Sequence, residues 1–70
     1  TALDKLGEEG FLECLQQVSP TSRTVFSLYV VDGYQHKEIA EMLDISVGTS
    51  RWHLSNAKNE MKVILNKLFN

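Results

Sequence analysis

The sequence predicts an all-α domain of four helices, without strands, that spans residues 1–70. Apolar residues recur about every three to four positions along most of the chain, which is the spacing of one face of a helix. Serine, proline and glycine stand between these runs at positions typical of helix ends, and no stretch alternates apolar and polar residues as a strand does. With 70 residues and 43% hydrophobic content, the chain can build one thin core.

The first predicted helix covers residues 3–17. Gly7 and Gly10 weaken it, because glycine has a low helix propensity. The chain has a single cysteine, Cys14, which has no second thiol for a disulfide or a metal site, so we expect a buried structural thiol in a reducing compartment. The apolar residues of this run are Leu3, Leu6, Phe11, Leu12, Leu15 and Val18.

A second helix is predicted over residues 20–31. Ser19 can cap its free N–H groups, and Pro20 loses no hydrogen bond at the first helical position. Asp32-Gly33 ends the helix, because glycine readily takes the left-handed conformation that closes one.

The third predicted helix covers residues 35–43 and the fourth covers residues 47–68. Glu38 lies where it can complete a capping box with Gln35. After a turn at Asp44-Ile45, a serine at position 46 can cap the long fourth helix, and nothing breaks that helix before its end. Its apolar residues form one narrow stripe: Leu54, Ala57, Met61, Ile64 and Leu68.

The net charge of −2 conceals an uneven distribution. Residues 1–18 carry four acids against one lysine, whereas residues 46–70 carry four cations against one glutamate. The basic half suits an anionic partner, and the acidic half is most simply a solvated face. No apolar stretch approaches the roughly 20 residues of a membrane helix. The chain starts at Thr1 without a signal-like segment, so we expect it to be part of a longer protein.

Two helices of about nine and twenty residues joined by about three have the geometry of a helix-turn-helix, whose second helix enters the DNA major groove. Taking Leu54 as the buried direction, Trp52, Asn56 and Asn59 lie about 140–200° away and are expected to face outward together. The N–H groups of Gly48 and the following threonine are expected to be free to attract a phosphate. A neighbouring flank consists of Arg51, Ser55, Lys58 and Lys62.

The stretch VSPTSRTVFSLYVVDGYQHKEIAEMLDISVGTSRWHLSNAKNEM resembles region 4, the C-terminal promoter-binding helix-turn-helix domain of bacterial sigma factors, and most closely that of the extracytoplasmic-function (ECF) group. The resemblance covers residues 18 to about 65 and implies a strand-free helix-turn-helix fold of the winged-helix-like, sigma region 4 type. The residues that carry it are Ser19-Pro20, Asp32-Gly33 with the aromatic residue after it, Lys37-Glu38-Ile39-Ala40 and Ile45-Ser46-Val47-Gly48-Thr49.

The resemblance implies a non-enzymatic module that reads the −35 promoter element with helix 47–68 and docks on the flap of core RNA polymerase. It further implies a cytoplasmic, nucleoid-associated protein without a cofactor or metal, and an anti-sigma factor is a further candidate partner. The family's phosphate-contacting positions fall on His36 and Lys37, and lysine at position 58 suits phosphate as well. The family's other DNA-contacting positions fall on Thr49, Arg51, Trp52, His53, Ser55 and Asn56.

Two departures from the family pattern weaken the expected DNA affinity. Asn56-Ala57-Lys58 stands where relatives typically have an Arg-Ala-Arg-like run, so we expect only about three to five phosphate contacts and a salt slope of about −3 to −5. Ser50 stands where relatives often have valine, and burial of this serine is tolerable because its hydroxyl can bond the carbonyl one turn back.

Several alternative interpretations stay open. The LuxR-like helix-turn-helix output domain of response regulators shares the Lys-Glu-Ile-Ala core, although its reading helix ends sooner. A protein-interaction module that binds polymerase or an anti-sigma factor is an alternative of another class, in which Trp52 serves as a protein-contact anchor. A nucleophilic pair of Cys14 and His53 would lack an orienting third residue, so we expect no enzyme.

Overall fold

The computed structural model describes residues 7–69, apart from the side chains at positions 8, 9, 68 and 69. In chain order, this part forms α2 (Glu8–Gln16), α3 (Pro20–Phe26), the π-helix η1 (Ser27–Val31), α4 (His36–Leu43) and α5 (Val47–Phe69), with no strand. Since η1 continues α3, four helices result and the predicted all-α class is confirmed. The structure begins α2 at Glu8 with Gly7 as its N-cap, and positions 3–6 of the predicted first helix lie outside the described residues.

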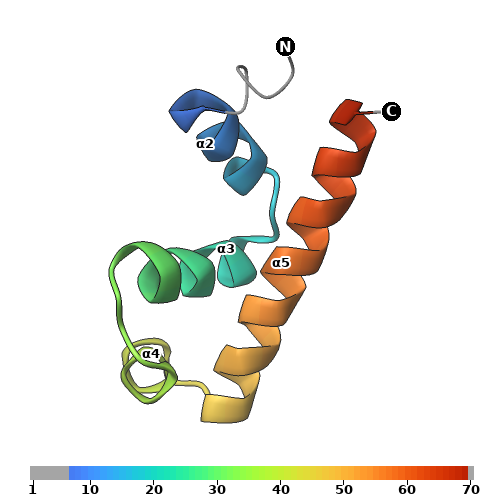
Figure 1. The fold of residues 1–70 in the computed structure, drawn as a ribbon. Helices are drawn as coiled ribbons and strands as arrows, with labels where there is room; N and C mark the ends of the chain where they lie inside the picture. Colours follow the sequence, from blue (N-terminus) through green and yellow to red (C-terminus); the bar gives the residue numbers. More distant parts are fainter. Residues whose placement is uncertain (1–6, 70) are drawn as a thin grey trace.

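Helix α5 runs along the whole molecule, and the three shorter helices line one side of it (Figure 1). Helix α3 packs against the middle of α5, α4 lies at its N-terminal end, and α2 lies beside its C-terminal half. Within residues 7–69, the opposite side of α5 is therefore left without a covering helix. None of the described helices is long and apolar enough to cross a membrane.

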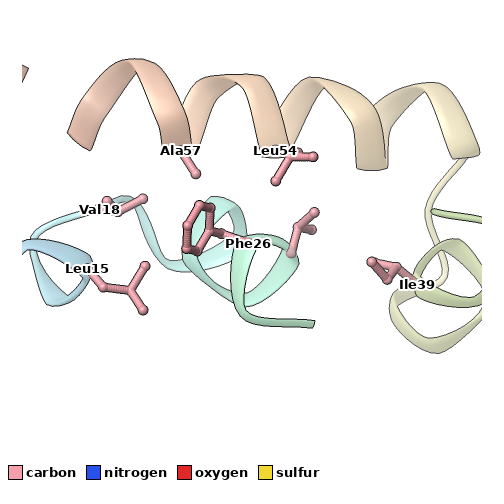
Figure 2. Packing of buried hydrophobic residues seen from close by; sticks show 7 residues of the cluster. Leu15, Val18, Phe26, Ile39, Leu54 and Ala57 are labelled. Atoms are coloured by element: carbon pink, nitrogen blue, oxygen red, sulfur yellow. The ribbon is translucent and has the colours of Figure 1, made fainter. Parts of the chain in front are cut away.

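The core lies between α5 and the shorter helices, as Figure 2 shows. Ile39 of α4 and Ala57 of α5 are completely buried, and Leu54 is 8% exposed. Burying a large aliphatic side chain such as Ile39 stabilises the fold by about 1.5–3 kcal/mol. The other buried members of the cluster are Leu15, Val18, Val25 and Phe26.

Only some residues of the apolar stripe predicted along the fourth helix belong to this core. Met61 and Ile64 are partly buried against the cluster, and the side chain of Leu68 lies outside the described residues. Leu12, which was expected on the apolar face of the first helix, is 50% exposed. Cys14 is buried as predicted, and desolvation by burial raises the pKa of its thiol, which makes it unreactive.

Two of the predicted helix starts are confirmed by their hydrogen bonds. The N–H of Thr49 donates to Oγ of Ser46 at 3.0 Å, so Ser46 caps α5. At the start of α4, the N–H of Gln35 donates to Oε1 of Glu38 at 3.1 Å, which is the expected contribution of the glutamate to a capping box.

The predicted cap of α3 is correct in position and wrong in its partner. Ser19 is the N-cap residue, but its side chain makes no capping hydrogen bond. Its hydroxyl donates instead to Oε1 of Glu60 at 2.7 Å, and its N–H donates to Oε2 at 3.3 Å. Hydrogen bonds to a carboxylate are stronger than those between neutral groups, so the serine bonds to α5 rather than to its own helix.

The helix predicted over residues 20–31 changes from α to π after Phe26. The N–H of Asp32 donates to the carbonyl of Ser27 at 3.0 Å, five residues back. The adjacent β-branched Val30-Val31 disfavours a regular α-helix in this turn. Gly33 then takes a φ of +78°, which confirms the predicted left-handed ending.

The turn between α4 and α5 has the tight geometry expected of a helix-turn-helix. Asp44 is left-handed, with φ 56° and ψ 49°, a conformation that aspartate tolerates better than most residues. The N–H of Ile45 donates to the carbonyl of Ala40 at 3.0 Å, and its side chain packs against the core. The turn thereby fixes the angle at which α5 leaves α4.

Candidate nucleic-acid interface

The side of α5 that faces away from the core carries a large aromatic residue. Trp52 is 60% exposed, and Ser55 and Asn59 on the same side are also exposed. The predicted outward orientation of Trp52 and Asn59 is therefore confirmed. The cations of the flank, Arg51, Lys58 and Lys62, are exposed as well.

A groove of about 570 Å³ runs between the start of α4 and the first half of α5. Four of the predicted DNA-contacting residues line it: His36 and Lys37 from α4, and Arg51 and Ser55 from α5. Lys58 lies about one turn after Ser55 on the same flank, close enough for its charge to act on His36. The helix-turn-helix therefore brings cations from two separate helices to one concave surface.

His36 lines this groove, and two contacts fix the position of its ring. Its ring stacks on Tyr29 at a centroid distance of 4.4 Å and an angle of 20°. Its Nδ1 is hydrogen-bonded to Oγ of Ser50 at 2.8 Å. Ser50 is completely buried, and the hydrogen-bond partner that makes this burial tolerable is the imidazole on the neighbouring helix rather than the carbonyl one turn back.

The environment of His36 disfavours its protonation. Desolvation by burial lowers the pKa of the imidazole below the ordinary value of 6.5, and the positive charges of Arg51 and Lys58 lower it further. In the folded state, His36 is therefore neutral at physiological pH, with Nδ1 engaged and Nε2 making no hydrogen bond within residues 7–69.

This lowered pKa predicts a pH-dependent stability. Because the unfolded chain binds the His36 proton at a higher pH than the folded chain, the free energy of unfolding should be greatest above about pH 6.5 and fall as the pH drops through the lower, folded pKa. Urea denaturation at a series of pH values between about 8 and about 5 measures this. In His36→Gln, the fall should be smaller; an unchanged pH profile would contradict the prediction.

His53 and Asn56 do not share the outward orientation of Trp52. The amide nitrogen of Asn56 donates to Oγ of Ser22 at 2.9 Å and to Oε2 of Glu60 at 3.1 Å. His53 Nδ1 is hydrogen-bonded to the same Ser22 Oγ at 2.9 Å. Both side chains are half-buried, so the expectation that Asn56 faces outward with Trp52 is wrong.

The reason lies in the true centre of the buried face of α5. Ser50 and Ala57 are completely buried, more so than Leu54. On a helical wheel, both lie about 40–60° from Leu54 toward His53 and Asn56. Taking Leu54 as the buried direction therefore misplaced the edge of the face that packs on α3.

Thr49 is exposed at the start of α5. Its hydroxyl accepts a hydrogen bond from Oγ of Ser46 at 2.8 Å, and its N–H is capped by the same serine. The expectation of a free N–H at Thr49 is therefore wrong. The ring of His53 meets Trp52 edge-on, with a centroid distance of 5.0 Å and an angle of 79°.

Three residues that shape this region were not among the predicted site residues: Ser22, Tyr29 and Glu60. Ser22 precedes the apolar residues Val25 and Phe26 by three and four positions, so helical spacing could have indicated that its side chain lies on the buried face. Glu60 is the single acid among the cations of the fourth helix, which also marks it. Among the described residues, no group of three or more His, Cys, Asp and Glu side chains could hold a metal ion.

A comparison of the sequence with protein families finds a match that covers most of the chain. The family described as sigma-70, region 4 matches residues 8–61, a span that contains α2, α3, η1, α4 and the first part of α5. No curated protein and no solved structure matches the chain.

Proposed function

Since the chain belongs to the sigma-70 region 4 family, we propose that it binds the −35 promoter element through the groove between α4 and α5, as the C-terminal domain of an ECF-type sigma factor. Region 4 of sigma-70 factors is in general involved in −35 recognition, a DNA-binding regulatory role. The family likewise supports RNA polymerase as a partner and a cytoplasmic setting. Docking on the polymerase flap, binding of an anti-sigma factor and association with the nucleoid are part of this proposal.

The observation that carries the proposal is that Lys37 of α4 and Arg51 of α5 line the same groove. Lys37 lies in the first turn of α4, where a helix N-terminus also favours a phosphate. Arg51 offers a planar set of donors that matches guanine or a phosphate. Trp52, which follows Arg51 in α5 and is 60% exposed, supplies an apolar surface for base contacts. A duplex placed along the groove would thus meet phosphate-binding and base-reading groups together.

A protein-interaction module remains the second candidate, because the fold occupies some of the expected base-reading groups. Both donors of Asn56 and the Nδ1 of His53 bond within the domain. The apolar Val30 and Val31 are 50% and 64% exposed, as a protein-binding surface would require. The response-regulator alternative has less support, since α5 continues unbroken to Phe69.

Binding should show the salt dependence of a few phosphate contacts. Fluorescence anisotropy of the chain on duplexes with a −35-like element should give a slope of about −3 to −5 in log affinity against log salt. Lys37→Ala should reduce the magnitude of this slope by about one, with similar losses on matched and mismatched duplexes, because a phosphate contact is sequence-independent.

Lys67→Ala is the matched control, since it removes the same charge from the last turn of α5, beyond the groove. Its slope should stay at the wild-type value. Equal changes in the two variants would mean that net charge, not the groove, determines binding. DNA binding that is insensitive to salt, together with firm capture of core polymerase, would favour the interaction module.

A further inference from the structure

A continuous set of polar side chains connects the first turn of α3 with the middle of α5. Ser19 donates to Glu60, Glu60 accepts from Asn56, Asn56 donates to Ser22, and Ser22 is bonded to His53. The distances between the bonded atoms range from 2.7 to 3.1 Å. Each member restricts the direction of the hydrogen bonds made by the next.

The direction is set first at Glu60. A carboxylate only accepts hydrogen bonds, so the side-chain group of Asn56 that faces it must be the NH₂ group. The two hydrogens of that group then go to Oε2 of Glu60 and to Oγ of Ser22. A reversed amide would place Oδ1 against the carboxylate, which would leave two acceptors facing each other. Glu60 therefore makes Ser22 an acceptor.

The direction at Ser22 follows from its burial. Its side chain is 1% exposed, so water is not at hand to accept the hydroxyl proton. Thr24, in the same helix, donates back to the carbonyl of Pro20, but Ser22 makes no such bond within the described residues. The nitrogen Nδ1 of His53, at 2.9 Å, is the acceptor within reach. Because a buried hydroxyl without an acceptor is unfavourable, the proton of Ser22 points to His53.

Because Nδ1 of His53 accepts, the proton of the neutral ring is on Nε2. We infer that Glu60, Asn56 and Ser22 form a hydrogen-bond chain of fixed direction that holds His53 as the Nε2–H tautomer and, resting on the proposed function, presents that N–H to an acceptor on the DNA beside Trp52. A single fixed donor suits purine N7, guanine O6, thymine O4 or a phosphate oxygen.

Asn56 and Glu60 are accordingly positioning residues that act through His53. With both N–H donors used, Asn56 has only its Oδ1 free, so it lacks the paired donor and acceptor with which asparagine reads adenine. The DNA contact expected of Asn56 is thus replaced by an internal role.

An exchange of the amide and the carboxylate provides the test. In the double variant Asn56→Asp/Glu60→Gln, net charge and side-chain size are nearly unchanged. The glutamine introduced at position 60 can still accept from the hydroxyl of Ser19 through its oxygen and can donate to the carboxylate at position 56 through its NH₂ group, which gives up only the longer bond from the N–H of Ser19. That carboxylate accepts the hydroxyl proton of Ser22, so Ser22 Oγ must accept from Nδ1–H of His53. The three hydrogen bonds that link positions 60, 56, 22 and 53 then run in the opposite direction, while Ser19 still donates to position 60.

Long-range ¹H–¹⁵N correlation spectra of ¹⁵N-histidine-labelled protein at about pH 8, where a histidine of ordinary pKa is neutral, report the tautomer directly, and His36→Gln assigns the signals. We expect Nε2–H for His53 in the wild type and Nδ1–H in the double variant, with native helicity by circular dichroism in both. Nδ1–H in the wild type, or the same tautomer in both proteins, would overturn the hydrogen-bond chain.

The proposed contact between His53 and DNA is tested separately, by fluorescence anisotropy at the same pH. Loss of the Nε2–H donor should weaken binding to the −35 duplex about fivefold, the effect of one ordinary hydrogen bond. A reversed tautomer with unchanged affinity would overturn the presentation of His53 to DNA. Failure of the proposed function would differ from both outcomes, because Lys37→Ala and the wild type would then bind the duplex equally.

Discussion

Replacing Ile39 with alanine is expected to lower the free energy of unfolding by about 2–5 kcal/mol. Ile39 is completely buried in the cluster that joins α4 to α3 and α5, so the truncated side chain leaves a cavity that neighbouring elements fill only in part. A domain of this length has a total stability of about 4–10 kcal/mol. The variant should therefore approach complete unfolding, as measured by urea denaturation followed by far-ultraviolet circular dichroism.

Met42→Ala is the control for this change, because it truncates an apolar residue of the same helix that is 48% exposed. Its free energy of unfolding should change by no more than about 0.5 kcal/mol. Comparable losses in the two variants would show that α4 does not bury the face that contains Ile39. The result also bears on the groove, since α4 carries His36 and Lys37 to it.

The helix ends show which features of the fold could be predicted from sequence. Ser46 caps α5 through a residue three positions away, so a short stretch of sequence contains both partners. Ser19 was placed correctly at the start of α3, but its partner Glu60 is 41 positions away. A cap defined by local pattern is predictable; a competing acceptor on another helix becomes visible only when the helices are packed.

The same distinction separates the site residues. Arg51 and Trp52 could be assigned to an exposed face because helical periodicity places them away from the apolar stripe. Ser50 stands four residues before Leu54 and seven before Ala57, so helical spacing could have placed it on the buried face as it could Ser22, but a face defined by hydrophobicity alone left this polar residue out. Because Ser50 was left out, the centre of the buried face was predicted too far from Asn56, and Asn56 was therefore predicted to face outward.

Replacing Arg51 with alanine should weaken binding to a matched −35 duplex by a factor of about 5–150, the usual value of one bidentate contact between arginine and guanine. The side chain is exposed and lines the groove, and it makes no hydrogen bond or ion pair with another described side chain. Its removal should therefore leave the free energy of unfolding within about 0.5 kcal/mol of the wild type. Anisotropy on matched and mismatched duplexes at one salt concentration measures the effect.

Arg51→Lys distinguishes reading of a base from binding of a phosphate. Lysine keeps the charge but cannot form two parallel hydrogen bonds, so this variant should bind mismatched DNA like the wild type and lose most of the preference for the matched duplex. Equal losses on both duplexes in Arg51→Ala would assign Arg51 to phosphate instead, and no loss on either would remove the groove from the DNA interface. Arg51→Ala also withdraws one of the charges that lower the pKa of His36. The pH at which the folded protein takes up the His36 proton should then rise toward the ordinary value, which verifies independently that the two side chains share the groove.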